Sequence, residues 1–214
     1  MILETRAAPP FFKNGFVLGC EETREGIVID PGDEVAELVA AVSRHRLKIR
    51  YILLTHAHLD HISGVAAARA AFDAPVALHP DDNFLYQAVV QQGEMFGLRV
   101  EAQPPVDFFY DGAGPWTFGT LGAWVHHTPG HCPGGVCLAV GREADRGREL
   151  FVGDTLFAGS IGRTDLPGGS LPTLLASIRD VLFAFPDETI VHPGHGDQTT
   201  IGREKRTNPF LQGQ

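Results

Sequence analysis

The residues best suited to chemistry in this chain are histidines and aspartates in four short segments. The densest segment is THAHLDH at 55–61, which follows the apolar run YILL. In extended backbone, residues two apart project to the same side, so His56, His58 and Asp60 can converge on one point. His61 lies directly beside them. Imidazole nitrogen and carboxylate oxygen are ligands of zinc, iron and manganese, so this segment predicts a metal site.

Three more candidate ligands each follow an apolar run that predicts a strand. They are His131 after GAWVHHTPG, Asp154 after ELFVG, and His195 after TIVHPG. Strand ends at one edge of a sheet are where α/β folds gather ligand-binding groups. A single His-x-His is usually an ordinary surface or core pair, but four such segments beside glycine turns are hard to explain that way. Seven donors exceed the need of one tetrahedral ion and favour two metal ions with a bridging carboxylate.

The overall composition excludes several other classes of protein. The chain has 214 residues and a formal net charge of −9, which argues against nucleic acid or an anionic membrane as partner. It contains no apolar run of membrane-spanning length, and its N-terminus does not resemble a secretory signal. The odd count of three cysteines indicates reduced thiols rather than a disulfide framework. We therefore expect a cytoplasmic protein.

The elements that must position these ligands alternate between strands and helices. Turns containing proline and glycine recur along the whole chain, as in one compact domain with many loops. We expect an α/β layered fold. The apolar runs predict strands at 26–30, 51–54, 75–78, 149–152 and 189–192, with strands and hairpins over 106–141. The helical spacing of apolar residues predicts helices from a cap at Asp33, and over 62–72, 81–92 and 171–185.

Beyond these patterns, the chain resembles the metallo-β-lactamase superfamily, and within it the small, single-domain glyoxalase II (hydroxyacylglutathione hydrolase)-like branch. The matching stretches are IDPGD at 29–33, THAHLDHISG at 55–64, TPGHCPGG at 128–135, GDTLFAGSIGRTDLPGG at 153–169 and PGHGDQTTIGREKRTNPFL at 193–211. The resemblance implies a four-layer αββα sandwich in which two mixed sheets are flanked by helices. It also implies a single domain over 1–214. Only residues 196–214 follow the last ligand, so no C-terminal helical glutathione-binding domain is expected.

The resemblance also implies how the seven donors divide between two metal ions. The first ion would be held by His56, His58 and His131. The second would be held by Asp60, His61 and His195. Asp154 would bridge the two. These ligands suit zinc, which we favour, and also iron or manganese.

The implied activity is that of a metal-dependent hydrolase of glyoxalase II type, which cleaves S-lactoylglutathione or a related small thioester with a metal-bridging hydroxide. Asp60 and Asp154 would be catalytic because they hold the metals and orient the hydroxide. The expected partner is a small anionic thioester or thiol-derived substrate. Arg163 is the candidate contact for a substrate carboxylate; the competing interpretation is a loop arginine paired with Asp165. Cys132 stands where this motif more often has threonine or serine.

Other functions remain open at this point. A mononuclear-iron persulfide dioxygenase uses the same fold and is similar to this chain over GRTD at 162–165. A lactonase or β-lactamase is a further possibility. The acidic charge opposes an RNA-processing nuclease of the same superfamily. A non-catalytic metal-binding module would not need the ring of glycine turns around the ligands. Oligomeric state is not indicated by the sequence.

Overall fold

The computed structural model describes residues 1–112, 114–145 and 148–212. The chain divides into two compact units. The first comprises residues 1–111 and 117–120, and the second 112–116 and 121–214. Residue 113, inside the region predicted to form hairpins, lies outside the described residues. The single domain expected over 1–214 stays a prediction.

The first unit is built on a mixed sheet with the strand order β1-β2-β3-β4-β5-β6. The antiparallel part joins β1 (Ile2–Ala8), β2 (Lys13–Gly19) and β3 (Glu25–Ile29). The parallel part continues from β3 to β4 (Lys48–Leu53), β5 (Val76–Leu78) and β6 (Phe108–Phe109). Parallel strands end at the same edge of a sheet. The loops that follow β3, β4 and β5 are therefore neighbours. The N-terminal hairpin of β1 and β2 was not among the predicted elements.

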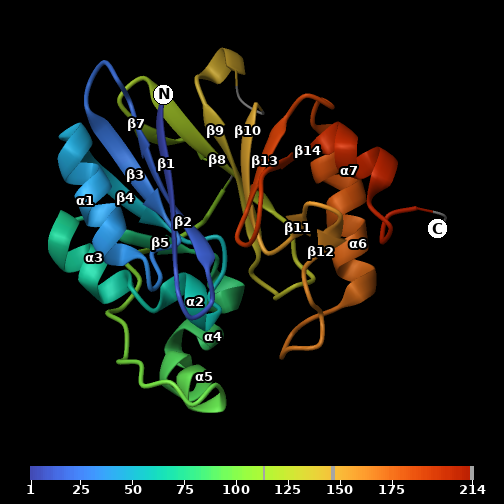
Figure 1. Ribbon diagram of the computed structural model, residues 1–214, viewed down its shortest axis with the longest axis horizontal. Helices are drawn as coiled ribbons and strands as arrows, with labels where there is room; N and C mark the ends of the chain where they lie inside the picture. The colour runs from blue at the N-terminus through green and yellow to red at the C-terminus, as the bar shows by residue number, and fades with distance from the viewer. Residues whose placement is uncertain (113, 146–147, 213–214) are drawn as a thin grey trace. The chain divides into compact units, whose positions relative to one another are not determined.

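Short helices accompany this sheet. They are α1 (Val35–His45), α2 (Leu59–Ile62), α3 (Val65–Phe72), the 3₁₀ turn η1 (Pro80–Asp82), α4 (Asn83–Gln87) and α5 (Val89–Met95). Figure 1 shows α1 and α3 side by side along the first sheet. The amphipathic spacing of α1 is confirmed, because Leu38 and Val42 are buried.

Three details of the helices predicted in the first unit were wrong. Asp33 does not cap α1: the cap position is Glu34, and Asp33 Oδ1 accepts a hydrogen bond from Ser63 Oγ at 3.3 Å. The helix expected over 62–72 is interrupted at Gly64, where a Cβ would lie 2.2 Å from the Gly32 carbonyl oxygen. The helix expected over 81–92 is divided at Ala88.

The second mixed sheet, which belongs to the second unit apart from Thr117 and Phe118, has the order β14-β13-β10-β9-β8-β7. Its strands are β7 (Trp116–Phe118), β8 (Leu121–His127), β9 (Val136–Gly141), β10 (Glu149–Gly153), β13 (Ile190–Pro193) and β14 (Thr199–Thr200). β10 and β13 are parallel, whereas β8–β9 and β9–β10 are antiparallel. β8, β10 and β13 therefore run in the same direction. A small hairpin joins β11 (Leu156–Phe157) to β12 (Ser160–Ile161).

The helical elements of this unit are η2 (Glu143–Asp145), α6 (Leu171–Asp180), η3 (Leu182–Ala184) and α7 (Ile201–Thr207). The buried face of α6 places Leu174 and Ile178 in a core cluster with Val152 of β10 and Val191 of β13. The helix predicted over 171–185 ends earlier, at Asp180, and gives way to η3. Pro186 limits η3 rather than α6, because Phe185, which precedes this proline, is held in extended backbone.

The predicted α/β fold class, with two mixed sheets flanked by helices, is confirmed. In each unit, parallel or co-directional strands bring the loops that carry candidate ligands to one edge. No helix in the described ranges is both long enough and apolar enough to cross a membrane.

Candidate metal centre

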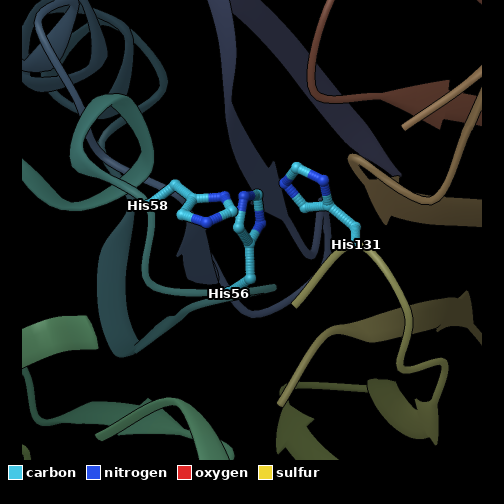
Figure 2. A group of neighbouring side chains, drawn as sticks. All are labelled: His56, His58 and His131. Atoms are coloured by element: carbon cyan, nitrogen blue, oxygen red, sulfur yellow. The ribbon is translucent and has the colours of Figure 1, made fainter. Parts of the chain in front are cut away.

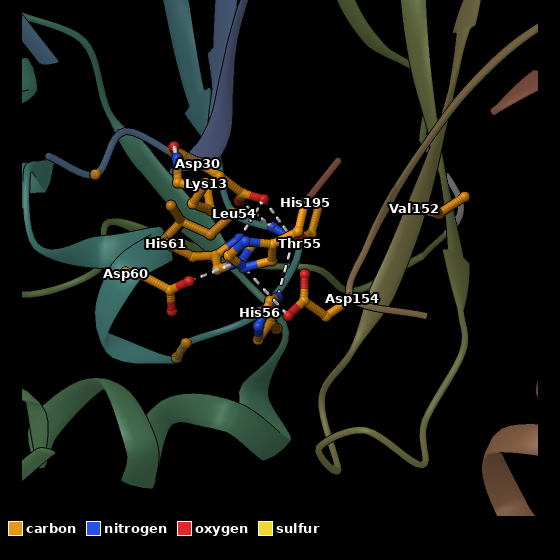
Figure 3. A network of polar contacts seen from close by, with 12 residues as sticks. Lys13, Asp30, Leu54, Thr55, His56, Asp60, His61, Val152, Asp154 and His195 are labelled. Atoms are coloured by element: carbon orange, nitrogen blue, oxygen red, sulfur yellow. Dashed lines mark hydrogen bonds and ion pairs between the residues drawn. The ribbon is translucent and has the colours of Figure 1, made fainter. Parts of the chain in front are cut away.

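In the first unit, the loop that follows β4 is attached to the residue that follows β3. Asp30 Oδ1 accepts a hydrogen bond from Thr55 N at 2.7 Å, and Asp30 Oδ2 accepts one from Thr55 Oγ1 at 2.5 Å. Both residues are buried. This arrangement follows from the topology, since β3 and β4 are parallel and end together. It fixes the backbone just before His56 (Figure 3).

The same carboxylate orients His61. His61 Nδ1 lies 2.9 Å from Asp30 Oδ2, and a carboxylate can only accept, so Nδ1 carries the proton. The lone pair is then on Nε2, which lies 3.7 Å from Asp60 Oδ2. His56 is likewise held through its Nδ1 atom, which lies 3.1 Å from Thr55 Oγ1. Fixing the tautomer through the distal nitrogen is how proteins orient metal-binding histidines.

Two further side chains fix the middle of the loop. Asp82 Oδ2, just after β5, accepts a hydrogen bond from Ala57 N at 3.0 Å. Gln92 on α5 accepts from Leu59 N and donates to the Ala57 carbonyl, each at 3.0 Å. Within this loop the rings of His56 and His58 lie edge to face, with centroids 4.9 Å apart (Figure 2).

In the second unit, the candidate ligands follow three strands of one direction. His131 lies in the loop after β8, Asp154 directly after β10, and His195 just after β13. Asp154 Oδ2 is 3.7 Å from His131 Nε2 and 3.6 Å from His195 Nε2. One carboxylate oxygen therefore lies near two imidazole nitrogens, an arrangement suited to metal ligation.

Backbone groups hold His131 in place. Its Nδ1 lies 2.8 Å from the Arg163 carbonyl oxygen, which leaves the Nε2 lone pair directed toward Asp154. Gly162 makes this close approach possible: a Cβ there would lie 1.8 Å from the Asp154 carbonyl oxygen and 3.3 Å from His131 Nδ1. Gly130, at φ +131°, lies against the backbone of α6, where a Cβ would be 2.2 Å from Leu174 N.

These donors suit a metal ion. His56, His58 and His61 are buried, and their Nε2 atoms make no hydrogen bond in the described part of the chain, although each ring has other contacts. The donor set of imidazole nitrogens and carboxylate oxygens, without thiolate, matches zinc, iron and manganese. Histidines oriented through Nδ1, with Nε2 left to face a ligand, complete the match.

The predicted residues are accordingly found in two groups, one in each unit. His56 and His58 lie in the loop after β4, and Asp60 and His61 lie on α2 rather than in the extended backbone that was predicted. His131, Asp154 and His195 gather in the second unit. Their roles as ligands, and the division into two metal sets, stay predictions.

Arg163 is paired with Asp165, as in the interpretation that competed with a substrate-binding role. Its Nε and Nη2 donate to the two carboxylate oxygens of Asp165, both at 2.7 Å, and both side chains are largely exposed. The hydrogen bonds from Arg163 lower the pKa of Asp165 to about 2. Cys132, next to His131, is fully buried, which is consistent with a packing role.

The supporting residues were not singled out from the sequence. Asp30 lies in IDPGD, and an aspartate that directly follows an apolar strand and precedes a Pro-Gly turn could have indicated its role. Asp82, Gln92 and Lys13 carry no comparable signal, because their partners lie far away in the sequence.

Comparison with known proteins identifies the class. Residues 8–195 match the family model of the metallo-β-lactamase superfamily. The chain belongs to this superfamily, whose fold binds metal ions, and it is a metallo-hydrolase of that class.

Individual relatives cover nearly the whole chain. A Haemophilus influenzae protein named hydroxyacylglutathione hydrolase GloC is 35% identical over 94% of this chain and 93% of its own length. The crystal structure of BLEG-1 B3 metallo-β-lactamase is 38% identical, with a TM-score of 0.89 over 99% of this chain and 100% of its own. TTHA1623, solved in a di-iron-bound form, is 41% identical, with a TM-score of 0.85 over 97% and 100%.

Proposed function

We propose that this protein is a thioester hydrolase of glyoxalase II type that uses two divalent metal ions. The observation that carries the proposal is the pair of histidines, His61 and His131, each held through Nδ1 with Nε2 directed toward a carboxylate. The resemblance to hydroxyacylglutathione hydrolase GloC over nearly the full length of both chains supports the thioester substrate.

The two groups of donors would act together. His56 and His58 with His131 would hold one ion, and Asp60 and His61 with His195 the other. Asp154 would bridge them. When bound, the ions would lower the pKa of a coordinated water and polarise the thioester carbonyl. Zinc is our favoured metal; iron is supported by the di-iron form of TTHA1623.

The protein's own residues have defined tasks in this reaction. Asp154 and Asp60 would hold the metal ions and orient the attacking water, and both side chains are partly accessible. Asp30 holds His61 in the tautomer that a ligand needs, and the Arg163 carbonyl does the same for His131. A thiolate is a good leaving group, so the mechanism requires no general acid from the chain.

The substrate is proposed to be a small anionic thioester, such as S-lactoylglutathione. Arg163 would contact its carboxylate by exchanging Asp165 for the substrate, since the pair lies at the surface. A cytoplasmic location fits the three free cysteines, all of which are buried.

Metal analysis combined with a substrate panel tests the proposal. The purified protein should contain two metal ions per chain and hydrolyse S-lactoylglutathione under nitrogen, with the released thiol followed by a chromogenic reagent. Lactones and β-lactams serve as competing substrates in the same panel. One iron per chain, with oxygen uptake in the presence of glutathione persulfide and no thioester cleavage, would overturn the proposal in favour of a persulfide dioxygenase.

A further inference from the structure

A buried ion pair lies in the first unit, next to the turn that supports the 55–61 loop. Lys13, the first residue of β2, and Glu34, just before α1, are each only 1% exposed. Lys13 Nζ lies 2.6 Å from Glu34 Oε1. Lysine and glutamate are almost never fully buried, and a buried pair contributes little net stability because both charges lose their hydration. Its presence therefore suggests a task other than stability.

The two side chains hold both ends of one tight turn. Lys13 Nζ donates a hydrogen bond to the Asp30 carbonyl oxygen, while Glu34 Oε1 accepts one from Gly32 N at 2.9 Å. Asp30 has φ +49°, in the left-handed region that residues other than glycine seldom adopt. The ion pair thus fixes a backbone conformation that the chain does not favour by itself.

Two glycines make room for this arrangement. A Cβ on Gly15 would lie 2.0 Å from Glu34 Oε1, so a larger residue would displace the carboxylate. A Cβ on Gly32 would lie 2.0 Å from the Asp60 carbonyl oxygen and 3.0 Å from Lys13 Cε. The turn is therefore packed between the lysine side chain and the backbone of Asp60.

This turn leads directly to the candidate ligands. The Asp30 carboxylate, which projects from it, receives hydrogen bonds from Thr55 and holds His61 Nδ1 at 2.9 Å (Figure 3). Lys13 pairs with Glu34, and the Asp30 carboxylate is thereby left to face His61 Nδ1. A negative carboxylate at Nδ1 raises the basicity of a metal-binding imidazole.

We propose that Lys13 and Glu34 are positioning residues for the metal ligands Asp60 and His61. The pair fixes the conformation of the Asp30–Gly32 turn. Through the Asp30 carboxylate this turn fixes the tautomer of His61, and through Gly32 it fixes the position of the Asp60 backbone. This inference rests on the proposed function for the identity of the ligands. It assigns the pair its main effect on the metal ion held by Asp60 and His61, because His61 contacts Asp30 directly whereas His56 contacts the network through Thr55.

The experiment uses the full chain with both charges removed. The single variant Lys13→Met would leave the Glu34 carboxylate buried without its partner and could fail to fold. The double variant Lys13→Met with Glu34→Gln leaves no unpaired buried charge, so it is the variant tested. Metal-free protein is titrated with Zn²⁺ against a chromogenic chelator, and the affinity of each equivalent is determined. We expect one equivalent to weaken by about 10- to 100-fold, the usual effect of losing a group that supports a ligand. The other equivalent should change by less than threefold.

A second readout needs no metal. Long-range ¹H–¹⁵N NMR of the metal-free protein should place the His61 proton on Nδ1 in the wild type and on a mixture of both nitrogens in the double variant. Arg69→Met is the matched control: it breaks an ion pair with Asp107 at 2.7 Å in the same unit, but at the surface. It should leave the tautomer and both affinities unchanged.

The outcomes separate this inference from the proposed function. A folded double variant with wild-type affinities and an unchanged His61 tautomer would overturn the positioning role. Equal weakening of both equivalents would also overturn it, since that is the result of general destabilisation. If the wild type itself binds fewer than two ions, the proposed function fails, and the His61 tautomer alone decides the positioning role.

Discussion

The two groups of candidate ligands are held by different means. In the first unit, the four donors lie on the 55–61 segment, which side chains from distant parts of the chain hold in place: Asp30, Asp82 and Gln92. In the second unit, three donors come from three separate strand ends, and the Arg163 carbonyl holds His131. The first group therefore depends on a polar network in the interior, and the second on close backbone packing.

Exposure differs less between the groups, because each has one partly exposed carboxylate: the Asp60 side chain is 15% exposed and that of Asp154 14%. The histidines differ more, since the His61 side chain is fully buried and that of His195 is 32% exposed. Buried polar networks give rigidity when every member is satisfied. We infer that the polar network preforms the first group, and that His195 is the most accessible donor of the second group.

The largest expected effect separates activity from stability. Asp154→Ala removes the proposed bridging ligand, so thioester hydrolysis should fall by about 1000-fold or more, and the metal content should drop. The metal-free variant should unfold at nearly the same urea concentration as the metal-free wild type, because Asp154 is partly exposed. Wild-type turnover in this variant would rule out a bridging role.

The next expected effect is on stability rather than on activity. Asp30→Ala deprives Thr55 and His61 of a buried acceptor, so we expect the metal-free protein to lose about 3 kcal/mol of unfolding free energy. Urea denaturation at constant m-value measures this loss. Asp165→Ala, which removes an exposed carboxylate, is the control and should leave the midpoint unchanged. A D30A protein as stable as the control would mean that the buried network is not what holds the first group.

An intermediate effect tests the backbone packing of the second group. In Gly162→Ala the new Cβ would meet the Asp154 carbonyl oxygen, and the loop must shift. We expect kcat/KM to fall by about 10- to 100-fold, since small misplacements of catalytic groups are costly. Gly112→Ala is the matched control, because a Cβ there meets nothing within 4 Å. Equal activity in both variants would contradict the role of this close approach.

The smallest effect concerns the surface. Arg163→Ala breaks an exposed ion pair, so stability should hardly change. If Arg163 contacts the substrate carboxylate, KM should rise by about 5- to 10-fold with little change in kcat, the signature of lost uniform binding. Steady-state kinetics with S-lactoylglutathione and with an uncharged thioester distinguish the cases: only the charged substrate should be affected.

Much of the fold could be predicted because its strands are short apolar runs, three of which end at Pro-Gly or Gly-Asp turns. The runs at 26–30, 51–54, 149–152 and 189–192 all became strands. The failures were local. Asp33 carries the chemistry of a helix cap, but its carboxylate bonds to Ser63 instead. The helices expected over 62–72 and 81–92 are divided at Gly64 and at Ala88. Neither break could be predicted, because the close approach of Gly64 to Gly32 and the end of a helix at Ala88 leave the spacing of apolar residues unchanged.

The sequence by itself determined the seven candidate ligands and the family, because ligand type and local spacing are properties of short segments. Only the tertiary structure revealed what orients those ligands. Asp30 reaches His61 because β3 and β4 are parallel neighbours, and Lys13 reaches Asp30 because β2 pairs with β3. Such contacts join residues 17 or 31 positions apart, and no local pattern encodes them. Hydrogen bonding across a sheet edge depends on strand order and direction, which exist only in the folded chain.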